Sequence, residues 1–249
     1  MDKIYNLLDE GKHQEADTLA IKLAKEAEKK GWQKLLSNAL EMRLAIAIEH
    51  NELEHAQILA DKLAKQPTTA YGLFLQARLL MQQKKNRQAL AMGREAYEYA
   101  QSHVASTPKV MFEKICNLLA KLLSNYGETA ESLDYYWKSV EAADTLQLKA
   151  LEYSNYLYTL HFLHNEPQEY FKAHVGYNEL FNDIPRYDHR KKYQLEAIER
   201  RPVGKIRIGY ISPDLRYHVV LRFCWVMLAN YDKEHFEVYC YHNNPIWIF

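Results

Sequence analysis

Residues 15–25 read EADTLAIKLAK, and residues 55–65, forty positions later, read HAQILADKLAK. Seven of the eleven positions are identical. Apolar residues in both stretches recur three and four positions apart, which is the spacing of one face of an α-helix. A more divergent form of the pattern returns from Gln88 to Ala96 and from Glu131 to Val140. The four copies are separated by 40, 33 and 43 residues, so one helical unit repeats along the chain.

A turn is expected about five residues before each copy, where one helix ends and its antiparallel partner begins. The four turns are Gly11–Lys12, His50–Asn51, Lys85–Asn86 and Tyr126–Gly127. A small residue follows each turn, at Ala16, Ala56, Ala89 and Ser132. Two helices joined by a short turn approach closely only where a side chain is small. These features are typical of tetratricopeptide repeats, although the spacing departs from their regular period of about 34 residues. They predict a mainly α-helical solenoid over residues 1–165 with a concave inner surface.

The amino-acid composition argues against several classes of fold and function. Lys+Arg and Asp+Glu number 32 each, so no net charge attracts a nucleic acid or an anionic membrane. Eight glycines in 249 residues argue against an all-β fold. The three cysteines are widely spaced and form no CxxC pair, so we expect neither disulfides nor a metal site. With no leader and no apolar run of membrane-spanning length, the sequence predicts a cytoplasmic protein without a cofactor of its own.

The pattern changes after Pro202. Lys205–Ser212 is a β-branched, apolar run that predicts a strand, Val219–Asn230 has the length and apolarity of a helix, and Phe236–Tyr241 predicts a second strand. Strand, helix and strand at this spacing form a βαβ unit, whose two strands pair in parallel. We therefore expect an incomplete α/β domain over residues 203–249.

Between the repeats and this βαβ unit, residues 166–202 are expected to form a helical, basic connecting segment.

The stretch KIRIGYISPDLRYHVV, from Lys205 to Val220, resembles the start of the catalytic region of O-linked N-acetylglucosamine transferases and their bacterial relatives. The family pattern is R-[IV]-G-Y-[VI]-S-x-D-F-x-x-H. The residues that match it are Arg207, Gly209, Tyr210, Ser212, Asp214 and His218, whereas Leu215 replaces the usual Phe. His235–Tyr241 resembles a second family motif, F-E-V-[FY]-C-Y. Tyr153–Leu157, followed by Glu169 and His174, resembles the segment that joins repeats and catalytic region.

The resemblance implies a two-lobed GT-B enzyme that moves a sugar, from UDP-N-acetylglucosamine, to a serine or threonine of a protein acceptor with inversion. The repeats would present that acceptor. Most of both lobes, including the lysine that neutralises the leaving diphosphate, has no counterpart in these 249 residues. We therefore expect the N-terminal portion of such an enzyme, truncated early in its first lobe and inactive alone. The alternative is a non-catalytic repeat module that binds a peptide or protein.

Four residues are candidate site residues. His218 matches the family's active-site histidine and could accept a proton or hold a hydroxyl group in place. Asp214 could orient the same loop, or it could cap the following helix. Asn117 and Asn155 each lie ten residues before a turn, at Gly127 and Asn165, so they are expected on equivalent helix faces. By the resemblance they would hold the backbone of a bound peptide. Otherwise they are two ordinary polar residues of helices.

Other patterns point to packing rather than chemistry. His161, His164 and His174 could approach a metal ion, but no further ligands accompany them, so we expect them to pack against tyrosines. Tyr135, Tyr136, Tyr153, Tyr156 and Tyr158 either contact a protein partner or belong to the core. No nucleophile elbow, Walker loop or GxGxxG motif is present.

Overall fold

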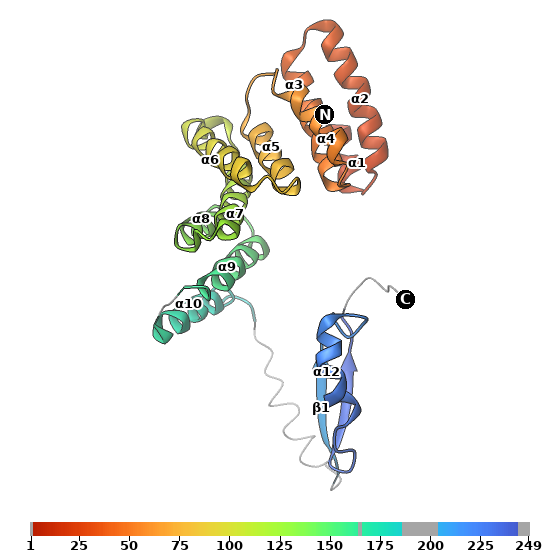
Figure 1. The fold of residues 1–249 in the computed structure, drawn as a ribbon, viewed down its shortest axis with the longest axis vertical. Helices are drawn as coiled ribbons and strands as arrows, with labels where there is room; N and C mark the ends of the chain where they lie inside the picture. Colours follow the sequence, from red (N-terminus) through yellow and green to blue (C-terminus); the bar gives the residue numbers. More distant parts are fainter. Residues whose placement is uncertain (1, 164–165, 186–203, 244–249) are drawn as a thin grey trace. The chain divides into compact units, whose positions relative to one another are not determined.

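The computed structural model describes residues 2–163, 166–185 and 204–243. The chain divides into two compact units, Met1–Ile184 and Pro185–Phe249 (Figure 1). The first unit is helical, and the described part of the second is a strand, a helix and a strand. The predicted fold class, mainly α with a short βαβ segment, is confirmed.

The helices of the first unit pack in sequential pairs: α1 with α2, α3 with α4, α5 with α6, α7 with α8, and α9 with α10 (Figure 1). The odd-numbered helix α5 also contacts α3 on one side and α7 on the other. A short 3-10 turn, Val104–Ser106, precedes α7. The bounds are α1 Asp2–Asp9, α2 His13–Lys30, α3 Gln33–Glu49, α4 Leu53–Leu63, α5 Ala70–Gln82, α6 Asn86–Ser102, α7 Lys109–Tyr126, α8 Thr129–Ala142, α9 Leu146–Leu160 and α10 Pro167–Glu179.

The four predicted turns are closed by one hydrogen-bond pattern. At the first turn, the N–H of Gly11 donates to the carbonyl of Leu8, and the N–H of Lys12 donates to that of Leu7. The same two bonds recur around Asn51, Lys84 and Gly127. In each turn the central residue has a positive φ, between 58° and 91°, as expected for a Schellman motif. The third turn lies at Lys84, one residue before the predicted position.

The small residue that follows each turn is fully buried. Its N–H donates to the carbonyl four residues earlier, so it lies in the first turn of the even-numbered helix. At this point the two helices of a pair meet, and a longer side chain would separate them. The role predicted for the small residues is confirmed, because none of the four has any exposed surface: Ala16, Ala56, Ala89 and Ser132.

The main hydrophobic core runs from α3 to α7. It is continuous across the pairs and is built largely of leucine and alanine, with Leu44, Leu75 and Leu119 fully buried. Helices α6 and α7 approach closely at Gly93, where an added β-carbon would lie 3.1 Å from Leu122 Cδ1. Each pair therefore buries its apolar face against its neighbours, as in other repeat proteins.

Helix α10 belongs to the helical unit. The Tyr153 hydroxyl on α9 donates to the carbonyl of Ala173 at 3.0 Å, and the Tyr153 and Tyr177 rings meet edge to face. The predicted connecting segment, residues 166–202, thus begins with a helix packed on the repeats. Its part from residue 186 onward lies outside the described residues.

The second unit is the predicted βαβ unit, with β1 at Ile206–Ile211, α12 at Val219–Ala229 and β2 at Phe236–Tyr241. The strands pair in parallel, with Ile206 opposite Phe236 and Ile211 opposite Tyr241. No residue of α12 is buried in the described structure, and Phe223 is 82% exposed.

Candidate functional site

The two asparagines predicted to hold a peptide share one partner in the structure. Asn117 on α7 donates from Nδ2 to Glu152 Oε2 on α9. Asn155 Nδ2 lies 3.4 Å from the same oxygen, and Ser139 Oγ on α8 lies 3.1 Å from it. Glu152 itself is buried. Side chains from three helices therefore surround one carboxylate oxygen. Their hydrogen bonds compensate for the cost of burying the charge of Glu152.

A second buried carboxyl group, Glu113 on α7, adjoins this cluster. Glu113 hydrogen-bonds to Glu152. Burial, followed by the negative charge of Glu152, raises the pKa of Glu113 to about 7, although Lys114 and Lys121 act in the opposite direction. Near neutral pH the Glu113 carboxyl is therefore protonated for a substantial fraction of the time, and in that form it donates a hydrogen bond to Glu152.

The amide groups of the two asparagines are only partly used. An amide group carries two N–H donors and one carbonyl acceptor. The bond to Glu152 occupies one N–H of Asn117, and both asparagines are half-buried rather than buried. Each side chain can therefore still donate one hydrogen bond and accept one. A peptide backbone can form both bonds, because it carries a carbonyl acceptor and an N–H donor.

Sequence reasoning missed Glu113, Glu152 and Ser139. A signal for Glu113 does exist, because it precedes Cys116 and Asn117 by three and four residues and so lies on a largely buried helix face. For Glu152 and Ser139 we find no comparable signal, since their proximity depends on how α7, α8 and α9 pack.

A simpler version of this arrangement joins α3 to α5. The Thr69 hydroxyl donates to the buried carboxyl of Glu41, and Thr69 Oγ1 accepts the N–H of Gly72 at 2.9 Å as the N-cap of α5. Burial raises the pKa of Glu41, while the bonds from Thr69 and Gly72 lower it. A buried carboxyl thus links two odd-numbered helices at both places.

The other two predicted site residues lie in the loop between β1 and α12. Ser212 follows the carboxyl end of β1, and its Oγ accepts the N–H of Asp214 at 3.1 Å. Asp214 Oδ1 lies 3.7 Å from His218 Nδ1. The structure therefore brings Asp214 and His218 together at the carboxyl end of a parallel strand, which is where ligands of α/β sheets bind.

The hydrogen bonds of His218 define its tautomer. Its Nδ1 accepts the N–H of Val220 at 3.2 Å. A ring nitrogen that accepts carries no proton, so in the neutral ring the proton is on Nε2. In this form Nε2 is a hydrogen-bond donor. The geometry favours holding an oxygen atom over removing a proton from it.

The same bond corrects one expectation. Asp214 was a candidate N-cap of the helix that follows, but the N-cap of α12 is His218, with extended backbone and its ring nitrogen bonded two residues ahead. Asp214 lies too far upstream, because three loop residues stand between it and His218. An imidazole nitrogen here takes the place of the oxygen that usually caps a helix.

Comparison with known proteins finds structural likenesses among solved structures. A solved structure of a mutant O-GlcNAc transferase from Thermobaculum terrenum is similar, with a TM-score of 0.49 and 18% sequence identity. The likeness covers 94% of this chain and 38% of that chain. No protein-family model and no curated protein sequence matches.

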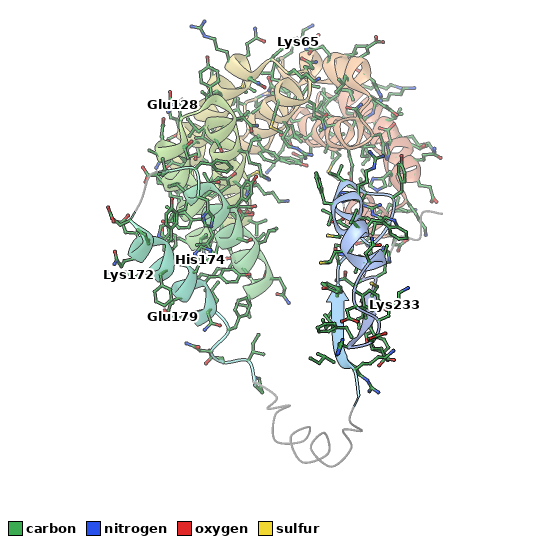
Figure 2. All side chains as sticks on the ribbon, turned by 60° about the horizontal axis from the view of Figure 1, so that its bottom comes forward. Lys65, Glu128, Lys172, His174, Glu179 and Lys233 are labelled. Carbon is green, nitrogen blue, oxygen red and sulfur yellow. The ribbon has the colours of Figure 1, made fainter. Side chains whose placement is uncertain are left out.

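The histidines considered as metal ligands pack against aromatic rings. His161 stacks on Tyr170 with ring centroids 5.2 Å apart, and the His174 ring lies 5.3 Å from His161 (His174 is labelled in Figure 2). His164 lies outside the described residues. Within residues 2–163, 166–185 and 204–243, no group of three or more histidine, cysteine or acidic side chains could hold a metal ion. In the same ranges, no helix is long and apolar enough to cross a membrane.

The tyrosine-rich stretch lies partly in the core and partly at the surface. Tyr136 and Tyr153 are buried, and Tyr153 meets Trp137, Tyr156 and Tyr177 edge to face. Tyr158 is different, because 70% of its surface is exposed.

Proposed function

We propose that this chain is the N-terminal portion of a protein O-glycosyltransferase, in which the helical unit binds the acceptor protein and the βαβ unit begins the first catalytic lobe. The donor is a nucleotide sugar, UDP-N-acetylglucosamine, and the acceptor is a serine or threonine hydroxyl. The observation that carries the proposal is the placement of Asp214 and His218, 3.7 Å apart, at the carboxyl end of β1.

The roles proposed for this pair follow from their bonds. With its proton on Nε2, His218 donates a hydrogen bond to an oxygen of the sugar or of the acceptor and so orients it. Asp214 steadies the imidazole when the ring is protonated, because only then does Nδ1 carry a proton that Asp214 can accept. Both residues are positioning groups in this account.

Acceptor binding is assigned to α7 and α9. Asn117 and Asn155 are held by Glu152 with amide groups that keep spare hydrogen-bonding capacity. An extended peptide crossing these helices would receive one amide from each. We propose that this contact binds the backbone of the acceptor, independent of its sequence.

Donor binding requires more of the enzyme than the described βαβ unit provides. The hollow between its strands and α12 has a volume of about 270 Å³ and a mainly apolar lining that includes Ile208, Tyr210 and Met227. Small-molecule sites usually measure about 300–1,000 Å³. We therefore expect this chain by itself to transfer no sugar.

Two titrations of the 249-residue chain test the proposal. Isothermal calorimetry with UDP should give no saturable heat, and micromolar affinity would contradict the expectation. Fluorescence anisotropy with labelled serine- and threonine-rich peptides should show binding that Asn117→Ala and Asn155→Ala each weaken. Gln76→Ala, on α5, is a control that should leave affinity unchanged. Equal affinities for all variants would overturn the acceptor assignment.

A non-catalytic repeat module remains the second candidate. It is favoured by the helical unit, which has a core that is continuous from α3 to α7, while no residue of α12 is buried. Sugar-transfer activity distinguishes the glycosyltransferase from the non-catalytic module. A chain extended by the remaining lobes transfers sugar in the first case, and His218→Ala then lowers the rate, whereas the second case predicts no transfer from any extension.

A further inference from the structure

The three helices around Asn117 and Asn155 carry exposed charge of one sign. Helices α5, α7 and α9, all within the described residues, contain two carboxyl groups, Glu113 and Glu152, and both are buried. The basic residues of the same helices are Arg78, Lys109, Lys114, Lys121 and Lys149. None of these basic residues is buried. The formal charge that the three helices present to solvent is therefore entirely positive, although the whole chain has no net charge.

The even-numbered helices of the same region differ. In α6 two arginines are balanced by Glu95 and Glu98. In α8 a single lysine stands against Glu131, Asp134 and Glu141. The positive charge thus belongs to one row of helices and not to this part of the chain as a whole. Successive first helices of a repeat stack form one continuous surface, so the charge has a common face.

Two of the lysines stand on either side of Asn117. Lys114 precedes it by three residues and Lys121 follows it by four, and residues at these spacings are neighbours on one helix face. Both lysines are exposed, and Asn117 between them is half-buried. The positive charges of both also act to lower the pKa of Glu113, which hydrogen-bonds to Glu152, the partner of Asn117. Spacing and electrostatics therefore both place the two ammonium groups close to the proposed acceptor site.

Arg78 extends this charge to the preceding repeat. It lies six residues before Lys84, which has the positive φ in the turn after α5. Lys121 lies six residues before Gly127, the equivalent residue of the turn after α7. Because α5 and α7 contact each other, Arg78 and Lys121 occupy equivalent positions on neighbouring helices. We call Arg78, Lys114 and Lys121 the basic cluster.

The charges of the basic cluster are not neutralised by the helical unit. Within the part of the chain that the structure describes, none of its three residues forms an ion pair with a carboxylate. Lys109 on the same helix is different, because its Nζ lies 3.4 Å from Asp144 Oδ1. Cations without an internal partner, placed around a hydrogen-bonding site, favour a ligand with negative charge.

The amide groups narrow the chemistry of that ligand. Asn117 and Asn155 can each donate and accept a hydrogen bond, and a peptide backbone offers both partners. The phosphates of a nucleic acid offer only acceptors, so they would leave the amide carbonyls without a partner. An acidic peptide satisfies both kinds of group, since its backbone can lie on the amides while its carboxylates reach the basic cluster.

We propose that the acceptor segment bound by α7 and α9 is acidic, with aspartate or glutamate residues beside its serine or threonine, and that the basic cluster selects it. The inference rests on the acceptor binding proposed above, because it names the class of peptide that binds there. Each solvent-accessible cation adds only modest affinity, so the cluster acts mainly on selectivity and on the rate of encounter.

Fluorescence anisotropy of the full chain with labelled peptides tests the proposal. The peptides share one serine and differ only in its flanking residues, which are all glutamate, all glutamine or all lysine. The glutamate peptide should bind most tightly, and its advantage should shrink as the salt concentration rises, because salt screens exposed charges. Lys114→Gln and Lys121→Gln should each weaken binding of the glutamate peptide about two- to fivefold and leave binding of the glutamine peptide unchanged.

A matched variant controls for net charge. Lys62→Gln, at an exposed position of α4, removes the same charge as the other two variants and should leave all affinities unchanged. Lys121→Glu should weaken binding of the glutamate peptide further and strengthen binding of the lysine peptide, since it reverses one charge of the basic cluster. The substituted lysines are exposed, so far-ultraviolet circular dichroism should match the wild type.

The outcomes separate this inference from the proposed function. If all the peptides bind equally and Asn117→Ala weakens each of them, acceptor binding stands and the acidic preference is wrong. If no peptide binds, both are wrong. Equal losses in Lys114→Gln and Lys62→Gln overturn the inference, because the effect is then one of net charge. A labelled oligothymidylate that binds more tightly than the glutamate peptide, and that Lys121→Glu releases, also overturns it and indicates a nucleic-acid surface.

Discussion

The helical unit and the βαβ unit bury their apolar residues to very different extents. In the helical unit, α3, α5 and α7 have buried residues on several sides, because each contacts its pair partner and its odd-numbered neighbours. In the βαβ unit, α12 is the most apolar of the described helices by sequence and yet has no buried residue. A helical repeat therefore forms its core with its immediate neighbours, whereas a two-stranded sheet needs further strands to bury its helix.

The largest contrast should come from core truncation. Leu119→Ala removes a fully buried side chain between α7 and its neighbours, and we expect a loss of about 2–5 kcal/mol in the free energy of unfolding. Phe223→Ala, on the exposed α12, should change it by no more than about 0.5 kcal/mol. Urea denaturation followed by circular dichroism measures both. Equal effects would show that α12 is buried in solution.

A second test examines the close approach of paired helices. Ala56→Leu adds three carbons at a position with no exposed surface, so it should destabilise the helical unit by about 1–3 kcal/mol through forced separation of α3 and α4. Ala130→Leu, at an exposed position of α8, is the control for the change in helix propensity. If both variants unfold at the wild-type midpoint, the small residue after each turn has no packing role.

The Glu113 carboxyl predicts a pH dependence specific to the helical unit. Its pKa of about 7 in the folded chain lies above the ordinary value of 4.5, so folding favours the protonated form. Its stabilising effect is complete below about pH 4.5 and is lost as the pH rises toward 7. Glu113→Gln should remove this component, which thermal unfolding at intervals between pH 4.5 and 8 measures. Parallel wild-type and variant curves would contradict the assignment.

The smallest effect is expected in the βαβ unit. His218→Ala removes the N-cap of α12 and should destabilise this helix by about 1 kcal/mol, while His218→Asn should retain a capping group. Hydrogen exchange of the α12 amides measures the change. Asp214→Ala should leave exchange unaltered, since Asp214 does not cap the helix, and faster exchange in that variant would show otherwise.

Most of the features that depend on neighbours along the chain were predicted correctly from the sequence. The turn at Gly127 and the buried Ser132 follow from local hydrogen bonds and from the size of one side chain. The parallel pairing of β1 with β2 follows from the strand–helix–strand order. The prediction that Asp214 caps α12 was wrong. Asp214 and His218 both precede the helix, and the local sequence does not show which of the two side chains caps it.

Local sequence is enough to specify the repeat, its turns and the order of the two units, because helix periodicity and turn chemistry involve only a few consecutive residues. The packing of the helices, in contrast, brings Glu113 and Glu152 together and gives Asn117 and Asn155 one shared carboxylate. These facts depend on how separate helices pack. Distances between side chains 35 or more residues apart are set by that packing and not by any local pattern.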